Sequence, residues 1–406
     1  MPDSPSPTPP ADRILGLDVL RGFALLGILV INIQAFAMPF ATLNNPTAYG
    51  DLTGANYLVW VVSHILAKRK FITLFSLLFG AGIVLFARSK RENEATRLHY
   101  RRTAFLLVAG LAHAYLLWYG DILVPYAVCG LVVFFVRDWE PRLLARVGLL
   151  LIAVPALMYI ASGVSLESTQ AVAAQWNPSD AAIAAEIDTY RSGWLAQFDH
   201  RIPTAISQQT SGFVALIFWR TSGLMLCGMA LFKWGVLSNE RSARFYRRLL
   251  TGGLLGGIPL ILAGVWYNEA VDWSVRALFF GSQFNYWGSL LLAGAYIGGV
   301  MLFCRRFGGG AVTGALSAVG RTAFSNYILQ TVIATTIFYG HGLGLFGSVT
   351  RVEQAGVVVT IWVVQIVLSV LWLRFCRFGP LEWLWRTVTY GERQPLRKST
   401  TADTDE

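Results

Sequence analysis

The sequence predicts an all-helical, polytopic integral membrane protein: a bundle of about ten transmembrane helices with both termini in the cytoplasm. Hydrophobic residues make up 55% of the 406 residues and charged residues only 14%, against about 25% charged residues in soluble domains. Long apolar runs alternate with short clusters of Lys and Arg, as topology signals do in membrane proteins. Because these clusters account for the net charge of +10, nucleic acid is not an expected partner.

The chain divides into one large domain with polar ends. Residues 1–12 are rich in Pro and Ser and predict a disordered lead-in. Residues 13–390 form a single transmembrane domain, and residues 391–406 a polar tail. The first apolar run, residues 13–38, is too long for the core of a signal peptide, so we expect it to be retained as the first helix.

The order of apolar runs and basic clusters predicts the topology. Residues 55–68 are too short and too interrupted to span and are expected at the interface. The basic cluster between residues 88 and 102 predicts a cytoplasmic loop. Residues 163–210 predict a long external loop, in which residues 181–198 have the periodicity of an amphipathic helix. The predicted spans are residues 13–38, 71–86, 104–119, 122–136, 143–162, 211–231, 249–267, 284–303, 315–339 and 352–373.

One basic cluster contradicts this topology. Lys68, Arg69 and Lys70 fall on the outside, where the insertion rule disfavours cations. Two explanations stay open. These side chains snorkel to lipid headgroups, or they face a phosphate-bearing ligand at the positive end of the helix that begins near Phe71.

The first helix carries a polar seam. Asp18 and Arg21 lie one turn apart, and Asn32 returns to the same side further along. Ionisable groups inside a membrane are costly unless they pair or face a cavity, so we expect Asp18 and Arg21 to pair with each other or with a neighbouring helix. A structural ion pair and a ligand-binding role are both open.

A second set of polar residues lies in the ninth span. Asn326 and Gln330 share a helix face, with Arg321 at its cytoplasmic end. They are either hydrogen-bonding glue between helices or the lining of the cavity that Asp18 and Arg21 face. An arginine at the inner mouth of such a cavity suits an anionic donor such as the phosphates of coenzyme A.

Five segments in order together resemble the YeiB-like family of bacterial inner-membrane proteins, named for domain of unknown function 418. They are Asp18-x-x-Arg21-Gly22-x-Ala24; Phe75-Ser-Leu-Leu-Phe-Gly-Ala-Gly82; Gly110-Leu-Ala-His113 with Gly120-Asp121-Ile-Leu and Tyr126-Ala; Gly320-Arg321-Thr-Ala-x-x-Asn326-Tyr-x-x-Gln330; and Gly379-Pro-Leu-Glu382-Trp-Leu-Trp385-Arg386 with Thr389-Tyr390. The resemblance implies a multi-pass protein of the bacterial inner membrane. In the last segment, Glu382 and Arg386 are spaced for an i, i+4 salt bridge.

The first helix also resembles that of a wider group of transmembrane acyltransferases, which includes the lysosomal heparan-alpha-glucosaminide N-acetyltransferase. This likeness implies transfer of an acetyl or other acyl group from cytoplasmic acyl-CoA to a hydroxyl or amine of an envelope or extracytoplasmic acceptor. The sugar O-acyltransferase branch has a His where this chain has Asn32. Because an amide cannot take a proton at neutral pH, no base carries over from this helix.

Acyl transfer needs a base, and histidine is its usual source. His113 lies within a predicted span, and Asp121 is placed to orient its ring if the chain folds back at the Gly120-Asp121 turn. A lone His on an apolar helix is more often a core residue. His64 is the second candidate, because the heparan-type enzymes carry a His after the first external loop. His99 and His200 fall in predicted loops and are expected to be solvated.

The sequence therefore favours a membrane-bound acyltransferase, with a transporter or exporter of a small polar solute as the alternative. No internal repeat of the kind common in transporters is evident in the sequence. No bound cofactor or metal is predicted, since the four cysteines have no ligand spacing and nucleotide-binding motifs are absent from the sequence. Acyl-CoA is the expected co-substrate. Membrane lipids and a small-molecule or glycan acceptor are the expected partners, and a homo-oligomer stays open.

Overall fold

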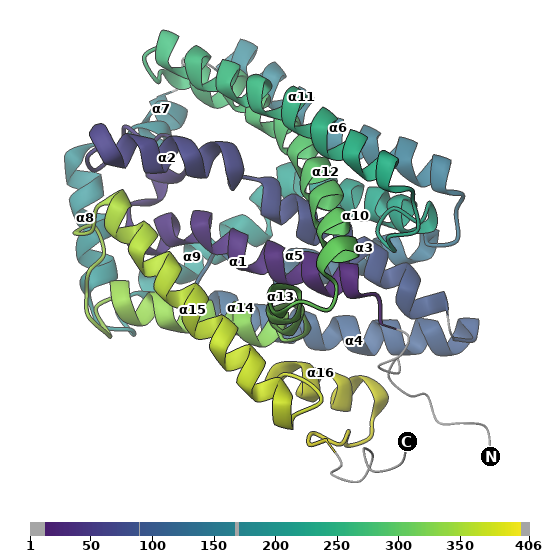
Figure 1. Ribbon diagram of the computed structural model, residues 1–406. Helices are drawn as coiled ribbons and strands as arrows, with labels where there is room; N and C mark the ends of the chain where they lie inside the picture. The colour runs from purple at the N-terminus through teal and green to yellow at the C-terminus, as the bar shows by residue number, and fades with distance from the viewer. Residues whose placement is uncertain (1–12, 89, 167–169, 399–406) are drawn as a thin grey trace.

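The computed structural model describes residues 13–88, 90–166 and 170–398, and this part of the chain is built almost entirely from helices (Figure 1). The first half contains α1 (Leu15–Ala37), η2 (Phe40–Leu43), α2 (Gly54–Leu66), α3 (Lys70–Arg88), α4 (Glu92–Ala112), η3 (His113–Leu117), α5 (Leu123–Val133), η4 (Phe134–Val136), α6 (Pro141–Leu166), α7 (Gln170–Trp176), α8 (Asp180–Arg191) and α9 (Phe198–Gln209). The second half contains η5 (Phe213–Ile217), α10 (Phe218–Lys233), α11 (Ala243–Ala270), η6 (Ala277–Gly281), α12 (Ser282–Phe307), α13 (Ala311–Arg321), α14 (Ala323–Phe338), α15 (Arg351–Phe375) and α16 (Pro380–Tyr390).

The described chain contains seven apolar helical stretches long enough to cross a membrane, judged by length and composition. They are Leu15–Ala37, Gly54–Arg88, Pro141–Ser165, Phe198–Lys233, Ala243–Ala270, Ala277–Phe307 and Arg351–Phe375. Two further apolar helical stretches, Leu123–Val136 and Ala323–Phe338, are shorter. The all-helical membrane class is confirmed, whereas the count of ten spans and the orientation of the termini stay predictions.

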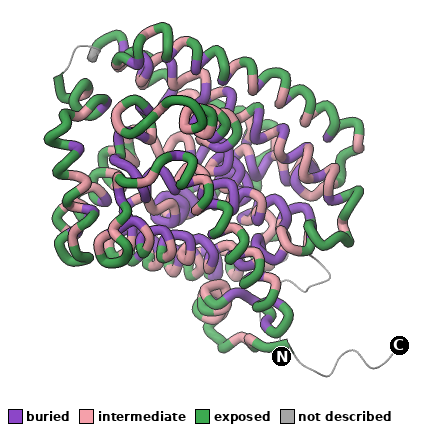
Figure 2. Tube along the Cα trace, turned by 60° about the vertical axis from the view of Figure 1, so that its left-hand side comes forward, coloured by how far each residue is buried: buried purple, intermediate pink, exposed green. Residues whose placement is uncertain are grey.

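Helix α1 is the central helix of the bundle. Its 23 residues correspond to a length of about 34 Å, which exceeds the roughly 30 Å of a bilayer core. Most of its side chains are buried, and it contacts α3, α12, α13, α14 and α15. Figure 2 shows the buried residues concentrated along the middle of the molecule, with exposed residues on the outer helices. The predicted span 13–38 matches this helix closely.

Glycine allows two pairs of helices to approach at backbone distance. A Cβ atom added to Gly320 on α13 would lie 1.9 Å from the carbonyl oxygen of Asp18 on α1, and one added to Gly22 would lie 2.0 Å from that of Leu316. Gly80 on α3 and Gly228 on α10 meet the facing helix in the same way, with a Cβ at 1.9 Å from a carbonyl oxygen in each case. Small residues at such crossings are the usual device of helix packing in membranes.

Three predicted boundaries are wrong. Residues 315–339 are two helices, because the backbone leaves the helical conformation at Thr322, where α13 ends and α14 begins. The basic residues after position 91 are on helix α4 instead of in a loop, since α4 starts at Glu92. The amphipathic helix predicted over 181–198 ends at Arg191, and a new helix begins at Phe198. The predicted lead-in, residues 1–12, and residues 399–406 lie outside the described residues.

Candidate functional site

A cavity of about 350 Å³ opens at the end of the bundle where α1 begins. Its walls come from α1, α3, α4, α5, the junction between α13 and α14, and α16. This volume falls within the range of small-molecule sites, roughly 300–1,000 Å³. The cavity therefore joins α1 to α16, the first and last helices of the described residues.

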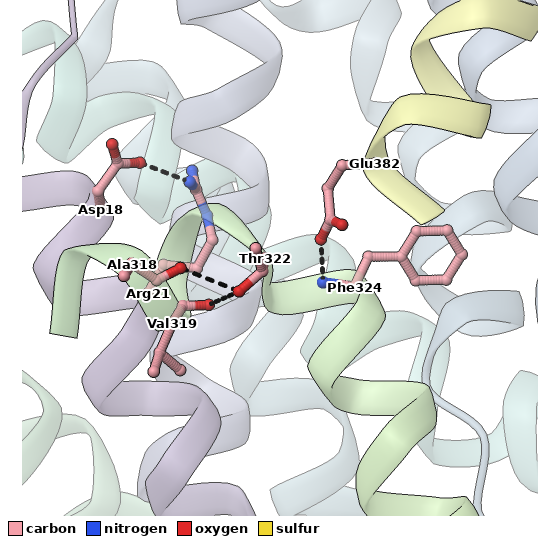
Figure 3. A network of polar contacts seen from close by, with 7 residues as sticks. All are labelled: Asp18, Arg21, Ala318, Val319, Thr322, Phe324 and Glu382. Atoms are coloured by element: carbon pink, nitrogen blue, oxygen red, sulfur yellow. Dashed lines mark hydrogen bonds and ion pairs between the residues drawn. The ribbon is translucent and has the colours of Figure 1, made fainter. Parts of the chain in front are cut away.

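The polar side of the cavity is dominated by arginine. Among the described lining residues are two carboxylates, Asp18 and Glu382, and both already have partners. The Asp18 carboxylate accepts from the Arg21 guanidinium at 2.9 Å. The pairing expected from the sequence is thus observed, and Figure 3 shows it on the opposite side of the α13–α14 junction from Glu382. The arginines that line the cavity are Arg13, Arg21, Arg102, Arg321, Arg377 and Arg386.

Glu382 is occupied by the start of helix α14. One carboxylate oxygen accepts from the backbone amides of Phe324 at 2.7 Å and Ser325 at 3.2 Å, and the other accepts from the Ser325 hydroxyl at 2.5 Å. Burial raises the pKa of the Glu382 carboxyl. A carboxylate at a helix N-terminus satisfies amides that have no partner in the helix itself. Glu382 therefore stabilises the break at Thr322 from a distant part of the sequence.

The arginines are held so that their positive charge remains available. The Arg102 guanidinium lies between the rings of Phe86 and Trp385, at 4.9 and 4.8 Å from their centroids. Burial lowers the pKa of Arg102 to about 10, which leaves it charged at neutral pH. The Nε atom of Arg321 is buried without a hydrogen-bond partner. Stacking on aromatic faces orients a guanidinium without using its donors, so these donors can serve an anionic ligand.

The deeper wall of the cavity is apolar and aromatic. Leu25, Phe75, Leu78 and Phe79 contribute to it, together with Tyr126. The Tyr126 hydroxyl lies 2.9 Å from the Ser76 hydroxyl, so its polar tip is turned into a hydrogen bond. A cavity with cations on one side and hydrocarbon on the other fits an amphipathic anion.

His113, Asp121 and Thr331 form a buried hydrogen-bonded chain. His113 Nδ1 lies 2.9 Å from an Asp121 carboxylate oxygen, and its Nε2 lies 2.9 Å from the Thr331 hydroxyl. Since a carboxylate accepts, Nδ1 carries the proton in the neutral ring, and Nε2 accepts from Thr331. His113 starts a π-helical turn, η3, a feature often found at functional sites. The order of carboxylate, imidazole and hydroxyl is that of a base with its orienting group.

The hydrogen-bonded group of His113, Asp121 and Thr331 lies one layer behind the cavity wall. Tyr327 lines the cavity, and its ring packs on that of His113 with centroids 5.0 Å apart. The Tyr327 hydroxyl accepts from the backbone amide of Ile122, which follows Asp121 and also lines the cavity. The second Asp121 oxygen accepts from the amide of Val124 and so holds the start of α5. The imidazole is therefore separated from the cavity by one aromatic ring.

His64, the second candidate base, belongs to a different cluster. Lys70 is fully buried, and its ammonium donates to the His64 carbonyl and to Asn285 Oδ1, each at 2.8 Å. The Asn285 amide nitrogen lies 2.8 Å from His64 Nε2. These residues are near the second half of α1, because Gln34 donates to Ser63, the residue before His64. Snorkelling is thus wrong for Lys70.

Similarity to known proteins extends over nearly the full length of the chain. It is 34% identical to the uncharacterized protein YeiB of Escherichia coli K12 over 400 residues, which covers 96% of this chain and 99% of YeiB. It is 35% identical to the uncharacterized protein YxaH of Bacillus subtilis 168, covering 97% and 98% of the two chains. Residues 231–392 match the family described as protein of unknown function (DUF418). The chain belongs to the YeiB-like family.

The YeiB-like chain brings only some of its predicted site residues together. Asp18, Arg21 and Arg321 line the Arg-rich cavity. Asn326 and Gln330 instead bond to helix α15: Asn326 donates to Ser369 at 2.8 Å, and Gln330 donates to Gln365 at 2.9 Å. Asn32 is half-buried and does not line the cavity. The amides of α14 therefore act between helices.

Other sequence predictions for the YeiB-like chain are wrong. His99 is 1% exposed, lies 3.1 Å from the Gly130 carbonyl and stacks on Phe134. His200 is half-buried and bonds to the Tyr190 hydroxyl. Instead of forming an ion pair with Arg386, Glu382 binds the start of α14. In each case tertiary contacts replaced the expected solvation or local pairing.

Several cavity residues of the YeiB-like chain escaped sequence reasoning. The sequence places Arg102 in a basic cluster that indicates topology and pairs Arg386 with Glu382, yet both arginines line the cavity. Thr331, one residue after Gln330, is a further residue that the sequence did not indicate, although its hydroxyl bonds to His113 Nε2. The sequence does contain a signal for these arginines, because three of the family's motif segments each have an arginine next to a glycine or a tryptophan. The pairs are Arg21-Gly22, Gly320-Arg321 and Trp385-Arg386.

Replacing Glu382 by glutamine is expected to lower the thermal midpoint of the purified protein. An amide retains one acceptor for the α14 amides but loses the charge that favours a helix N-terminus, a loss of about 1 kcal/mol. Differential scanning fluorimetry of the two proteins measures the change. Glu392→Gln is the matched control, because Glu392 is exposed on the following segment. Equal midpoints for Glu382→Gln and the wild type would contradict the capping role.

Proposed function

We propose that this protein is a membrane-bound acyltransferase that transfers an acetyl or similar group from acyl-CoA to a hydroxyl or amine on an envelope or extracytoplasmic acceptor. The observation that carries the proposal is the cavity of about 350 Å³ with six arginines on one side and an apolar wall on the other. The likeness of the first helix to transmembrane acyltransferases supports it. In this proposal the chain crosses the inner membrane about ten times with both termini in the cytoplasm.

Acyl-CoA matches the two sides of the cavity. Its phosphate groups are anions that guanidinium groups bind with paired N–H donors. Its pantetheine arm and acyl group are less polar and fit the wall around Phe75 and Tyr126. Because the cavity has positive charge beyond its two occupied carboxylates, a bound anion also relieves repulsion between the arginines. With the termini inside, the mouth of the cavity faces the cytoplasm, where acyl-CoA is found.

The transfer itself needs a proton acceptor. The acceptor's oxygen or nitrogen attacks the thioester carbonyl carbon, the carbon–sulfur bond breaks, and coenzyme A leaves as the thiolate. The proton of the attacking group passes to a base, and the thiolate is protonated in turn. We assign the base to His113, because Asp121 fixes its ring and leaves Nε2 with a lone pair. In this proposal the acceptor replaces the Thr331 hydroxyl at Nε2, and the Tyr327 ring that separates His113 from the cavity turns aside to admit it.

Binding of acetyl-CoA to the detergent-purified protein tests the donor site. Isothermal titration calorimetry is expected to show saturable binding, which is weaker for acetyl-CoA lacking the 3′-phosphate. Arg386→Gln is expected to weaken binding about tenfold or more, since a charge-assisted hydrogen bond contributes roughly 1.5–3 kcal/mol. Arg374→Gln is the matched control: Arg374 is exposed at the end of α15 and does not line the cavity.

Transport is the competing outcome of this experiment. Absence of binding at millimolar acetyl-CoA, in a protein with a normal melting transition, would overturn the acyltransferase proposal. Uptake of a small polar solute into proteoliposomes would then be the next measurement. Equal loss of affinity in Arg386→Gln and Arg374→Gln would move the binding site away from the cavity.

A further inference from the structure

We propose that His64, Lys68 and Arg69 form a second binding site, which takes a small oxyanion such as a phosphate or carboxylate group. The site lies at the turn between α2 and α3 (Figure 1), where Lys68 and Arg69 precede the first residue of α3. It is separate from the Arg-rich cavity, since the two share no lining residue. The inference does not depend on the acyltransferase proposal.

The local charge is positive and has no internal compensation. Four cations are close together here: Lys68, Arg69, Lys70 and Arg220. The Arg220 guanidinium lies 4.0 Å from the centroid of the Tyr286 ring. Arg69 approaches the same ring at 5.5 Å. None of the ion pairs formed by the described residues includes any of these four cations. Buried positive charge without a negatively charged partner is costly, so the surroundings favour an anion.

The hydrogen bonds of this cluster determine which nitrogen of His64 carries the proton. Lys70 has donors and no acceptor, so the oxygen of the Asn285 amide must face its ammonium group. The Asn285 amide nitrogen consequently faces His64 Nε2, which accepts from it. In the neutral ring the proton is then on Nδ1. The chain Lys70–Asn285–His64 therefore presents an N–H donor at Nδ1.

That donor has no partner in the structure. His64 is 6% exposed, and its Nδ1 is buried without a hydrogen bond. His64, Lys68, Arg69 and Asn285 line a polar cavity of about 30 Å³. Since one water needs about 10–15 Å³ by this measure, the space accepts two or three waters, or the oxygens of one small anion. A buried N–H donor beside two cations points to an acceptor with negative charge.

The backbone adds to the same field. Arg69 has a left-handed backbone conformation, with φ of 69°, which is uncommon for a residue other than glycine. This turn places the two cations directly before α3, whose N-terminus carries the positive end of the helix dipole. Arg69, with its left-handed backbone, and His64, with its unpaired N–H, thus line one cavity directly before the start of α3.

Thermal stability in the presence of inorganic phosphate tests the site in the full-length protein. Ligands that bind the folded state raise the melting midpoint with their concentration. The assay uses Arg386→Gln as background, which weakens phosphate binding in the Arg-rich cavity; any shift that this cavity still produces is also present in the double variant with His64→Gln and is subtracted. We expect potassium phosphate to raise the midpoint saturably above potassium chloride of equal ionic strength. His64→Gln in that background should reduce the phosphate affinity at least tenfold.

His64→Gln is chosen because it separates binding from folding. The glutamine side-chain oxygen reaches the position of Nε2 and still accepts from Asn285, whereas the N–H at the Nδ1 position is lost. Its melting midpoint without phosphate is therefore expected to stay near that of the background protein. Arg88→Gln, at the exposed opposite end of α3, is the matched charge control and should leave the phosphate response unchanged.

A lipid arm identifies the source of the anion. The same proteins are melted in nanodiscs of phosphatidylcholine with and without phosphatidic acid. A shift with free phosphate assigns the site to a soluble anion, and a shift with phosphatidic acid alone assigns it to a lipid headgroup; both outcomes require loss of the shift in His64→Gln. No shift in either arm, or an equal shift in His64→Gln, overturns the proposal.

Discussion

Replacing Gly320 by alanine is expected to destabilise the protein by about 3 kcal/mol or more, because one methyl group would collide with the backbone of α1. The added Cβ lies 1.9 Å from the Asp18 carbonyl oxygen and 2.8 Å from the Gly22 nitrogen. A backbone atom cannot move aside as a flexible side chain does, so α1 and α13 must separate. Separation also displaces Asp18 and Arg321, and the cavity loses its shape.

The control lies on the same helix and has the opposite sign. Gly314 on α13 has no atom within 4 Å of an added Cβ, so Gly314→Ala should be neutral or stabilise by up to about 1 kcal/mol through helix propensity. Thermal melts and size-exclusion profiles of both purified variants measure the difference. Similar midpoints for Gly320→Ala and Gly314→Ala would show that the α1–α13 contact is looser than described.

The second large effect concerns His113. His113→Ala is expected to abolish acyl transfer, since a general base contributes roughly 10²- to 10⁴-fold to the rate. It should also destabilise the fold by about 3–5 kcal/mol, because the Asp121 carboxylate would remain buried without its partner. Both side chains of this pair are 1% exposed. A loss of activity in His113→Ala alone therefore has two explanations.

His113→Gln distinguishes a base from a structural residue. The glutamine amide reaches the position of Nε2 and can bond to Thr331, but it loses the N–H that His113 donates to Asp121 and cannot take the proton of an acceptor. We expect a smaller fall in melting midpoint than for His113→Ala, because glutamine fills more of the space and keeps the contact with Thr331, together with a loss of turnover as large as that of His113→Ala. Turnover is measured as release of the coenzyme A thiol, at a temperature where both variants remain folded. Full activity in His113→Gln would remove His113 from the reaction.

The sequence predicted the fold class and most helices because a membrane helix is marked by the apolar residues of its own segment, whatever it packs against. The span predicted over 13–38 agrees with α1, and that over 352–373 agrees with α15. The prediction from sequence failed at Thr322, where the helix is interrupted. The interruption depends on the close packing of Gly320 on α1 and on the hydrogen bond from the Phe324 amide to Glu382 of α16. Those contacts join residues that are far apart in the chain, and no periodicity records them.

The candidate site was predictable in part for the same reason. The Asp18–Arg21 pair follows from helical spacing, and the observed contact between His113 and Asp121 was anticipated from the turn at Gly120. Arg102 was not assigned to a cavity, because a cation near an apolar run indicates topology and binding equally well. Its role became visible when the structure placed it between Phe86 and Trp385.

The Arg-rich cavity is lined by residues far apart in the sequence, and this has a consequence for biosynthesis. Arg13 and Asp18 are synthesised long before Glu382 and Arg386, which lie on α16. During translation α1 is inserted while its Asp18–Arg21 pair still lacks α16 as a neighbouring wall. A chain without α16 would keep the earlier helices but leave the cavity open on one side. The binding site is therefore complete only after α16 has been synthesised and has packed against the other walls.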